Sequence, residues 1–468
     1  MSTINKLKKY IFGKKDLSDK DVKGLLISFS IPSILAIIVN GLYSVIDSIF
    51  VGRGVGEVAI GAIAIIQPFI GIIITLGTVI STGAMSVLSR SLGENDNEKA
   101  KICFGNSMTL ISTMSILVCI IGTIFLNPIL RIMGAEGEIF ILGRQYMRII
   151  LVGMIFMAPS FLFGQLLRAE GKAKESMVIL VIGSISNIIL DYIFIIVFKG
   201  GATGAALATT IAYFLSFLYA LFMMAKFSSV FVLKIKYLRL KVSIIKEMLS
   251  IGISSFISQG AGNVATIVAN NVMVQVGGER LITSIGIFAI IQNFVFMPIS
   301  GITQSMQPII GYNYGRGNLE KIKETVKLTL KYVFIVALVN SIIVMLFTAP
   351  IVRLFIKGDS EVLAYSVPYI RLGIIFACFG AQQWVGGTVF RSLGMAKRAY
   401  FFAVLRMIII FMPSMIILGN TIGELGCWIS YTLADLLSGL VSKRYILRFL
   451  NKLEMDKVEK LQCEGKEA

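Results

Sequence analysis

The chain has 468 residues, of which 56% are hydrophobic and 15% are charged. This composition excludes an ordinary soluble protein and predicts an all-α protein that crosses a membrane many times. The formal net charge of +18 does not indicate nucleic-acid binding, because the basic residues stand in short loops rather than on one face beside stacking aromatic residues.

Apolar runs separated by glycine, proline or charged clusters predict twelve transmembrane helices. We expect them at roughly residues 25–50, 58–89, 102–126, 141–167, 176–198, 203–225, 247–276, 281–313, 325–349, 366–390, 399–419 and 424–447.

The first predicted helix carries one charged side chain, Asp47, within the apolar stretch 30–52. A carboxylate at membrane depth costs about 2.5–3.5 kcal/mol, so it usually faces other protein groups or a water-filled cavity. Asp47 is therefore a candidate functional residue. The alternative is an acid that reaches the membrane interface near Arg53.

The chain also contains an internal repeat. The sequence GQLLRAEGKAK at 164–174 recurs as GTVFRSLGMAK at 387–397, and LGENDNEKAK at 92–101 recurs as YGRGNLEKIK at 314–323. This repeat predicts two six-helix lobes. Since an even number of spans returns the chain to the same membrane face, the lobes should be related by pseudo-two-fold symmetry along the membrane normal.

Lysine and arginine gather in alternate connecting segments, and the positive-inside rule then places both termini in the cytoplasm. We interpret the basic linker between the lobes as an anchor on anionic lipid. The expected parts are a first lobe at 1–225, a cytoplasmic basic linker at 226–246, a second lobe at 247–449 and a cytoplasmic tail at 450–468.

Five polar residues share the outer third of the first lobe when depth is counted at about 1.5 Å per residue. They are Asp47, Tyr146, Asn187, Asp191 and Thr209. Such oxygen ligands suit a small alkali cation, and two facing carboxylates equally suit proton storage. The set predicts a coupling site for H⁺ or Na⁺, with all members except Tyr146 as possible sodium ligands. The alternative is that lipid headgroups or water neutralise each acid separately.

The second lobe lacks this set, because Asn270 and Ser414 stand at the repeat positions of Asp47 and Asp191. Its polar residues Arg406 and Asp435 have matching depths on neighbouring helices and predict a structural ion pair, with a second coupling site as the alternative.

Proline residues interrupt several of the predicted helices, and Pro32 does so in the first. Such breaks often mark bends that serve gating, although a proline near a helix end can simply be a cap.

The whole chain resembles the multidrug and toxic compound extrusion (MATE) family, especially its bacterial multidrug pumps. The stretches that carry the resemblance are IPSILAIIVNGLYSVIDSIFVG, NIILDYIFI, GATGAALATTIAY, LLRAEGKAK and VFRSLGMAK. The resemblance implies two lobes that alternate between inward-open and outward-open forms and export amphipathic, mostly cationic drugs in exchange for H⁺ or Na⁺. It places the cation site on the five polar residues of the first lobe, with Pro32 at a bend of the first helix.

The same resemblance implies a multi-pass protein of the bacterial plasma (inner) membrane. We expect a monomer without a cofactor, whose partners are small-molecule lipophilic cations and membrane lipid.

Other functions remain as alternatives. A flippase for a lipid-linked precursor should line its cavity with several cations, and few candidates exist besides Arg148, Arg371 and Arg406. An intramembrane enzyme is not expected, since the chain has no histidine, no HExxH and no GxSxG motif. A passive channel is disfavoured by the repeat, which suits alternating access.

Overall fold

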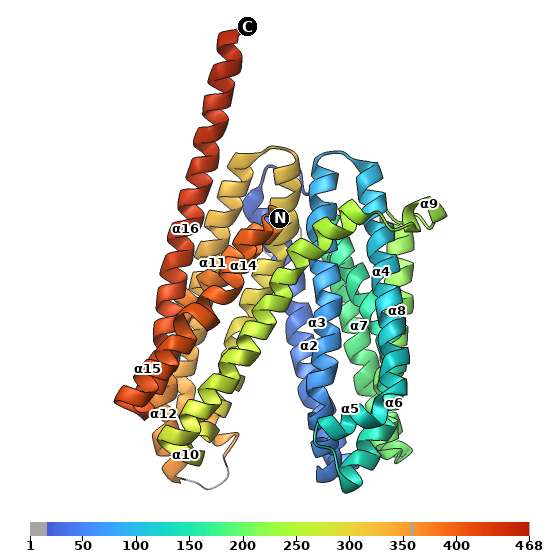
Figure 1. Cartoon of the computed structure of the whole chain (residues 1–468), viewed down its shortest axis with the longest axis vertical. Coiled ribbons are helices and arrows are strands. Elements are labelled where there is room, and N and C mark those ends of the chain that lie inside the picture. Colours follow the sequence, from blue (N-terminus) through green and yellow to red (C-terminus); the bar gives the residue numbers. More distant parts are fainter. Residues whose placement is uncertain (1–15, 357–359, 468) are drawn as a thin grey trace, which may run out of the picture. The chain divides into compact units, whose positions relative to one another are not determined.

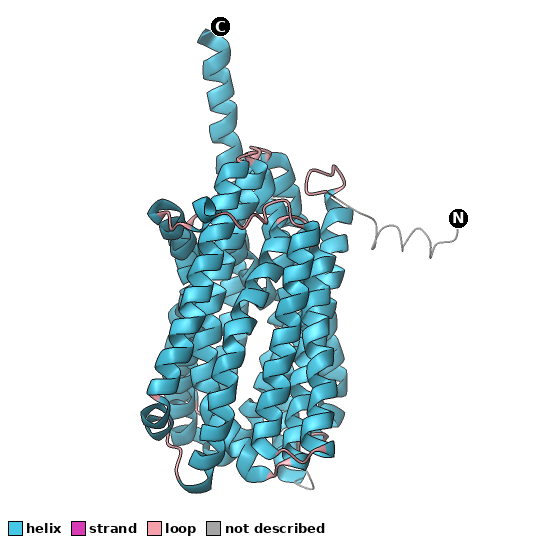
Figure 2. Cartoon of the chain, turned by 90° about the vertical axis from the view of Figure 1, so that its right-hand side faces the viewer, coloured by secondary structure: helices cyan, strands magenta, loops and turns pink. Residues whose placement is uncertain are grey.

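The computed structural model describes residues 16–356 and 360–467. These residues form helices joined by short loops, without a strand (Figures 1 and 2). The prediction of an all-α membrane protein is thus confirmed.

The helices of the first half of the chain are α2 (Val22–Gly54), α3 (Glu57–Gly93), α4 (Asn97–Ile124), α5 (Leu126–Ile132), α6 (Gly137–Ala169), α7 (Ala173–Asp191), the π-helix η1 (Tyr192–Val197) and α8 (Gly201–Phe227). The second half consists of α9 (Ile235–Leu238), α10 (Val242–Gly315), α11 (Leu319–Arg353), α12 (Ser360–Ile374), α13 (Ala377–Ser392), α14 (Ala396–Val404), the π-helix η2 (Leu405–Phe411), α15 (Met412–Ile422) and α16 (Glu424–Glu467).

All twelve expected membrane passages are present in the described part of the chain. Ten helices are long and apolar enough to cross a membrane, and the pair α12–α13, bent by 47°, forms an eleventh. The 74 residues of α10 would span about 110 Å if straight, far more than one bilayer. Its backbone breaks at Gly278, where φ is +61°, and so α10 supplies two passages.

The sequence repeat is also a repeat of local geometry. The Asp96 carboxylate accepts a hydrogen bond from the Lys99 amide at 2.9 Å and caps α4. At the equivalent place the Asn318 side chain accepts from the Lys321 amide at 3.1 Å and caps α11. Each cap satisfies an amide that the first turn of the helix leaves unpaired.

Two compact units can be separated by their internal contacts. One contains residues up to Ile34 together with residues from Ile253 onward, and the other contains Leu35–Gly252. The helices α2 and α10 therefore each contribute to both units. The lobe boundaries expected from the sequence stay a prediction.

The first turns of α10 pack against α3 at very short range. A Cβ atom on Gly83 would lie 2.0 Å from the Met248 carbonyl oxygen, and one on Gly252 would lie 2.0 Å from the Val79 carbonyl oxygen. Both positions thus require glycine for the two backbones to approach. This contact fixes the start of α10 within the Leu35–Gly252 unit.

The basic linker is tied to α4 rather than loose. The buried Asn106 amide donates to the carbonyl oxygens of Tyr237 and Arg239 at 3.0 and 2.9 Å and accepts from the Lys241 amide at 2.6 Å. Because one side chain satisfies three backbone groups of the linker, the short helix α9 has a fixed place on its own unit.

Candidate functional site

Asp191 lies where α7 gives way to the π-helical turn η1. Its side chain is fully buried, and Asn187, one turn earlier on the same helical face, is 2% exposed. A π-helical turn is rare and often lies at a functional site. The irregular turn therefore marks the residue that depth alone selected from the sequence.

The Asp47 carboxyl of α2 faces Asp191 and interacts with it. Among the described residues, no donor reaches either carboxylate oxygen of Asp191. Two ionised carboxylates in a dry site repel each other. Their contact is favourable only if they share a proton or if a cation lies between them.

Three further side chains with oxygen atoms extend this pair of carboxylates. The Asn187 amide donates to the Thr209 hydroxyl at 3.2 Å, while the Asn187 amide oxygen is buried without a donor in the part of the chain that the structure describes. Tyr146 interacts electrostatically with Asp47 and Asp191 and also contacts Thr209. The structure thus brings all five residues of the predicted site together inside the Leu35–Gly252 unit.

Two tyrosines beside this set were missed in the sequence. Tyr43 and Tyr213 interact with each other and with Asp47. Helical spacing could have found them, because Tyr43 precedes Asp47 by one turn and Tyr213 follows Thr209 by one turn. Their hydroxyl groups add polar partners around the carboxylates.

The equivalent positions of the second repeat form no such cluster. Asn270 is exposed on α10, and the Ser414 hydroxyl donates to the Ile410 carbonyl oxygen of its own helix at 2.7 Å. Neither position offers a carboxylate.

Arg406 and Asp435 lie together in the other unit. Arg406 Nε donates to Asp435 Oδ1 at 2.6 Å, and Asp435 is fully buried while Arg406 is 8% exposed. Gly380 of α13 makes room for the carboxylate, since a Cβ atom there would lie 2.4 Å from Asp435 Oδ1. Arg406 is also the second residue of η2, so both π-helices adjoin a buried charged residue.

Pro32 is inside α2, two residues before the border between the units. Proline removes one backbone hydrogen bond and loosens the turn before it. In that turn the Ser305 hydroxyl lies 2.9 Å from the Phe29 carbonyl oxygen and 3.0 Å from the Ser33 hydroxyl. The interrupted turn of α2 is therefore held by a side chain of α10.

Comparison with known proteins gives a consistent set of similarities. The family model described as MatE matches residues 32–193 and 251–417. The multidrug export protein MepA of Staphylococcus aureus is 24% identical over 437 residues, which cover 93% of this chain and 96% of that protein.

Solved structures agree with this result. A crystal structure of a MATE protein in complex with MaD3S has a TM-score of 0.88 at 25% identity and covers 94% of this chain and 98% of its own. A transporter of the MOP superfamily from Pyrococcus furiosus has a TM-score of 0.86 at 25% identity with the same coverage.

Proposed function

Because this chain belongs to the MatE family of efflux transporters, we propose that it is a multidrug antiporter. It exports amphipathic, mostly cationic drugs in exchange for H⁺ or Na⁺. It does so as a multi-pass protein of the bacterial plasma membrane with both termini in the cytoplasm. The MepA relatives are named as multidrug export proteins, which supports drugs as the substrate class.

One observation carries the coupling part of this proposal. The Asp191 carboxylate is fully buried, has no donor among the described residues and faces a second carboxylate, Asp47. A charge in this position is costly unless a cation joins it. A proton shared by the two acids removes the repulsion. A sodium ion does the same with the oxygens of Asn187 and Thr209 as further ligands.

Two helices that belong to both units support alternating access. Among the described helices, only α2 and α10 contribute residues to both compact units, so a change of angle between the units would act on these two helices. Pro32 weakens α2 next to one border, and we assign it the role of a gating bend. The lobes predicted at 1–225 and 247–449 would be the moving bodies.

Exchange requires that cation and drug compete for binding, because a transporter that binds both at the same time loses coupling. Protonation of the acid pair removes the negative charge that attracts a cationic drug. Drug affinity should therefore fall as pH falls, and Na⁺ at constant pH should lower it in the same direction if sodium uses these oxygens. Fluorescence titration of a cationic dye with purified protein measures both effects.

Asp47→Asn provides the matched test of this competition. It removes one titrating group and keeps the size and shape of the side chain. The pH dependence of dye affinity should become flat in this variant. A wild-type affinity that does not change with pH or with Na⁺ would contradict the competition scheme.

The flippase alternative finds less support. Within its own unit, Arg371 Nε donates to the Thr348 hydroxyl at 3.4 Å, and Arg406 is bound to Asp435. Two of the three candidate arginines are thus engaged by the protein, and the third, Arg148, lies about 160° around α6 from the buried Tyr146 of the carboxylate cluster. A pyrophosphate substrate would need several available cations in one cavity. Drug export therefore remains the function that we propose.

A further inference from the structure

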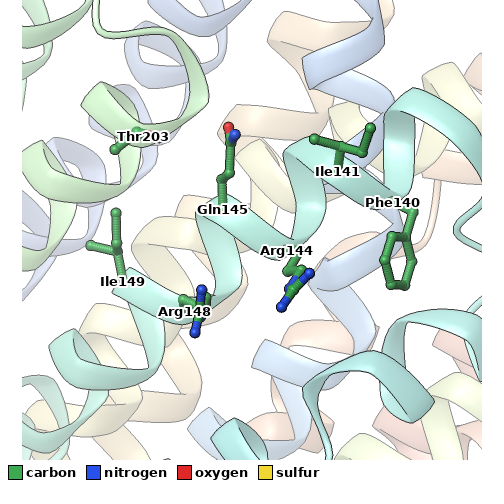
Figure 3. Close-up of a pocket in the computed structure, with 7 residues that line it drawn as sticks. All are labelled: Phe140, Ile141, Arg144, Gln145, Arg148, Ile149 and Thr203. Atoms are coloured by element: carbon green, nitrogen blue, oxygen red, sulfur yellow. The ribbon is translucent and has the colours of Figure 1, made fainter.

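We infer that the outer surface of α6 binds the phosphate of an anionic membrane lipid, at a site separate from the proposed transport site. Arg144, Arg148 and five neighbours surround an open groove of about 480 Å³ at the start of α6 and α8. Figure 3 shows both arginines on the same side of α6, next to each other, with Thr203 of α8 across the groove. The remaining lining residues are Phe140, Ile141, Gln145 and Ile149.

Within the described part of the chain, the two arginines have no partner that balances their charge. Both are exposed, and neither makes an ion pair or hydrogen bond with any residue that the structure describes. The nearest acid on the same helix, Glu138, is six residues before Arg144 and so lies about 120° around the helix. Like charges one turn apart repel each other, so a bound anion would stabilise this pair.

These side chains face away from the carboxylate cluster. Arg144 and Arg148 are each two residues from Tyr146, which places them about 160° around α6 from that buried side chain. The same stripe continues with Ile141, which is 57% exposed, and Val152, which is 45% exposed. A stripe of exposed apolar residues on a membrane-spanning helix faces lipid. The arginines are therefore flanked on both sides by exposed apolar side chains, a surface suited to contact with lipid.

The depth of the pair suits a lipid headgroup. Arg144 and Arg148 lie about 10 and 16 Å along the helix from Gly137, where α6 begins. Side chains on a helix tilt toward its amino end, which here is the end near the membrane surface. Long arginine side chains can thus reach the phosphate layer while their stems stay in hydrocarbon.

The chemistry of the groove selects a phosphodiester. A guanidinium group binds phosphate oxygens through two parallel hydrogen bonds, and two such groups one turn apart can hold one phosphate. The Gln145 and Thr203 side chains offer further polar contacts to the headgroup, while Phe140, Ile141 and Ile149 offer an apolar wall for an acyl chain. Phosphatidylglycerol has both features and one net negative charge. Phosphatidylcholine has the same phosphodiester, but its choline cation would be repelled by the two arginines.

The test is a binding measurement that does not depend on transport. Purified protein in neutral detergent is titrated with fluorescent phosphatidylglycerol and, in parallel, with fluorescent phosphatidylcholine. We expect the glycerol lipid to bind more tightly, and the double variant R144Q/R148Q to weaken its binding about thirtyfold. Phosphatidylcholine binding should change little in that variant.

A control variant removes the same amount of charge elsewhere. R53Q/R131Q changes two other exposed arginines of the same unit and should leave phosphatidylglycerol affinity close to wild type. Melting curves of both double variants should stay close to the wild type, since no ion pair or hydrogen bond among the described residues is lost. Equal lipid affinity in R144Q/R148Q and wild type, or an equal loss in the control, would overturn the site. Displacement of the lipid by millimolar inorganic phosphate would show a free-anion site and overturn the lipid assignment.

Discussion

Asp191→Asn is expected to reduce cation-driven dye efflux to the level of cells without the transporter. The substitution keeps the size of the side chain but removes the group that can take up a proton or hold a sodium ion. Its new amide can donate to the Asp47 carboxylate that faces position 191, so the variant should fold and melt at or above the wild-type temperature. Asn187→Ala should also lose transport, since it removes an oxygen that has no other partner in the described chain.

The second repeat supplies a matched control for this result. Ser414 stands where the repeat would place Asp191, and among the described residues its hydroxyl bonds only to the Ile410 carbonyl oxygen, one turn earlier. Ser414→Ala should therefore transport at the wild-type rate. Efflux in cells, corrected for the amount of transporter in the membrane, measures all three variants. Normal efflux by Asp191→Asn would remove the acid pair from the coupling mechanism.

Loss of either partner of the Arg406–Asp435 pair should be strongly destabilising. Asp435 is fully buried and accepts from Arg406 at 2.6 Å, so Asp435→Leu leaves a buried guanidinium without its counter-charge. Breaking a buried pair in this way costs about 3–5 kcal/mol, while replacing both members by apolar residues can be neutral. The double variant Arg406→Met/Asp435→Leu should therefore melt at a higher temperature than either single variant.

A double-mutant cycle of melting temperatures in detergent measures this coupling. Strictly additive losses would mean that the two charges do not stabilise each other. An Asp435→Leu protein that melts normally but fails to transport would instead indicate a second coupling site, the alternative left open by the sequence.

Much of the fold could be predicted because hydropathy and length constrain membrane helices strongly. Apolar runs predicted all twelve passages, and the recurring loop sequences predicted two similar six-helix halves. The matched caps at Asp96 and Asn318 then showed that the repeat extends to local geometry. The ends of the helices were harder to predict from the sequence. The last helix was expected to end at 447, yet α16 continues to Glu467 and extends well past α11 and α14 (Figure 1). Charged residues end a hydrophobic run without ending a helix, since lysine and glutamate are good helix formers.

The local irregularities could not be predicted. Both π-helical turns, η1 after Asp191 and η2 around Arg406, lie at buried charged residues and have no simple sequence signal. The five polar residues of the site were found because the depth of a residue in the membrane can be counted along its helix at about 1.5 Å per residue. Tyr43 and Tyr213 were missed because tyrosine is also common in apolar surroundings, where its hydroxyl needs only one partner.

Flux in proteoliposomes tests most directly whether the protein exchanges drug for cation. Vesicles that contain purified protein and a cationic dye are subjected in turn to an imposed pH gradient, an imposed Na⁺ gradient and no gradient. We expect dye movement against its own gradient with at least one of the two cation gradients, and none with Asp191→Asn. Dye movement that only follows the dye gradient, with the same rate in all three conditions, would contradict antiport.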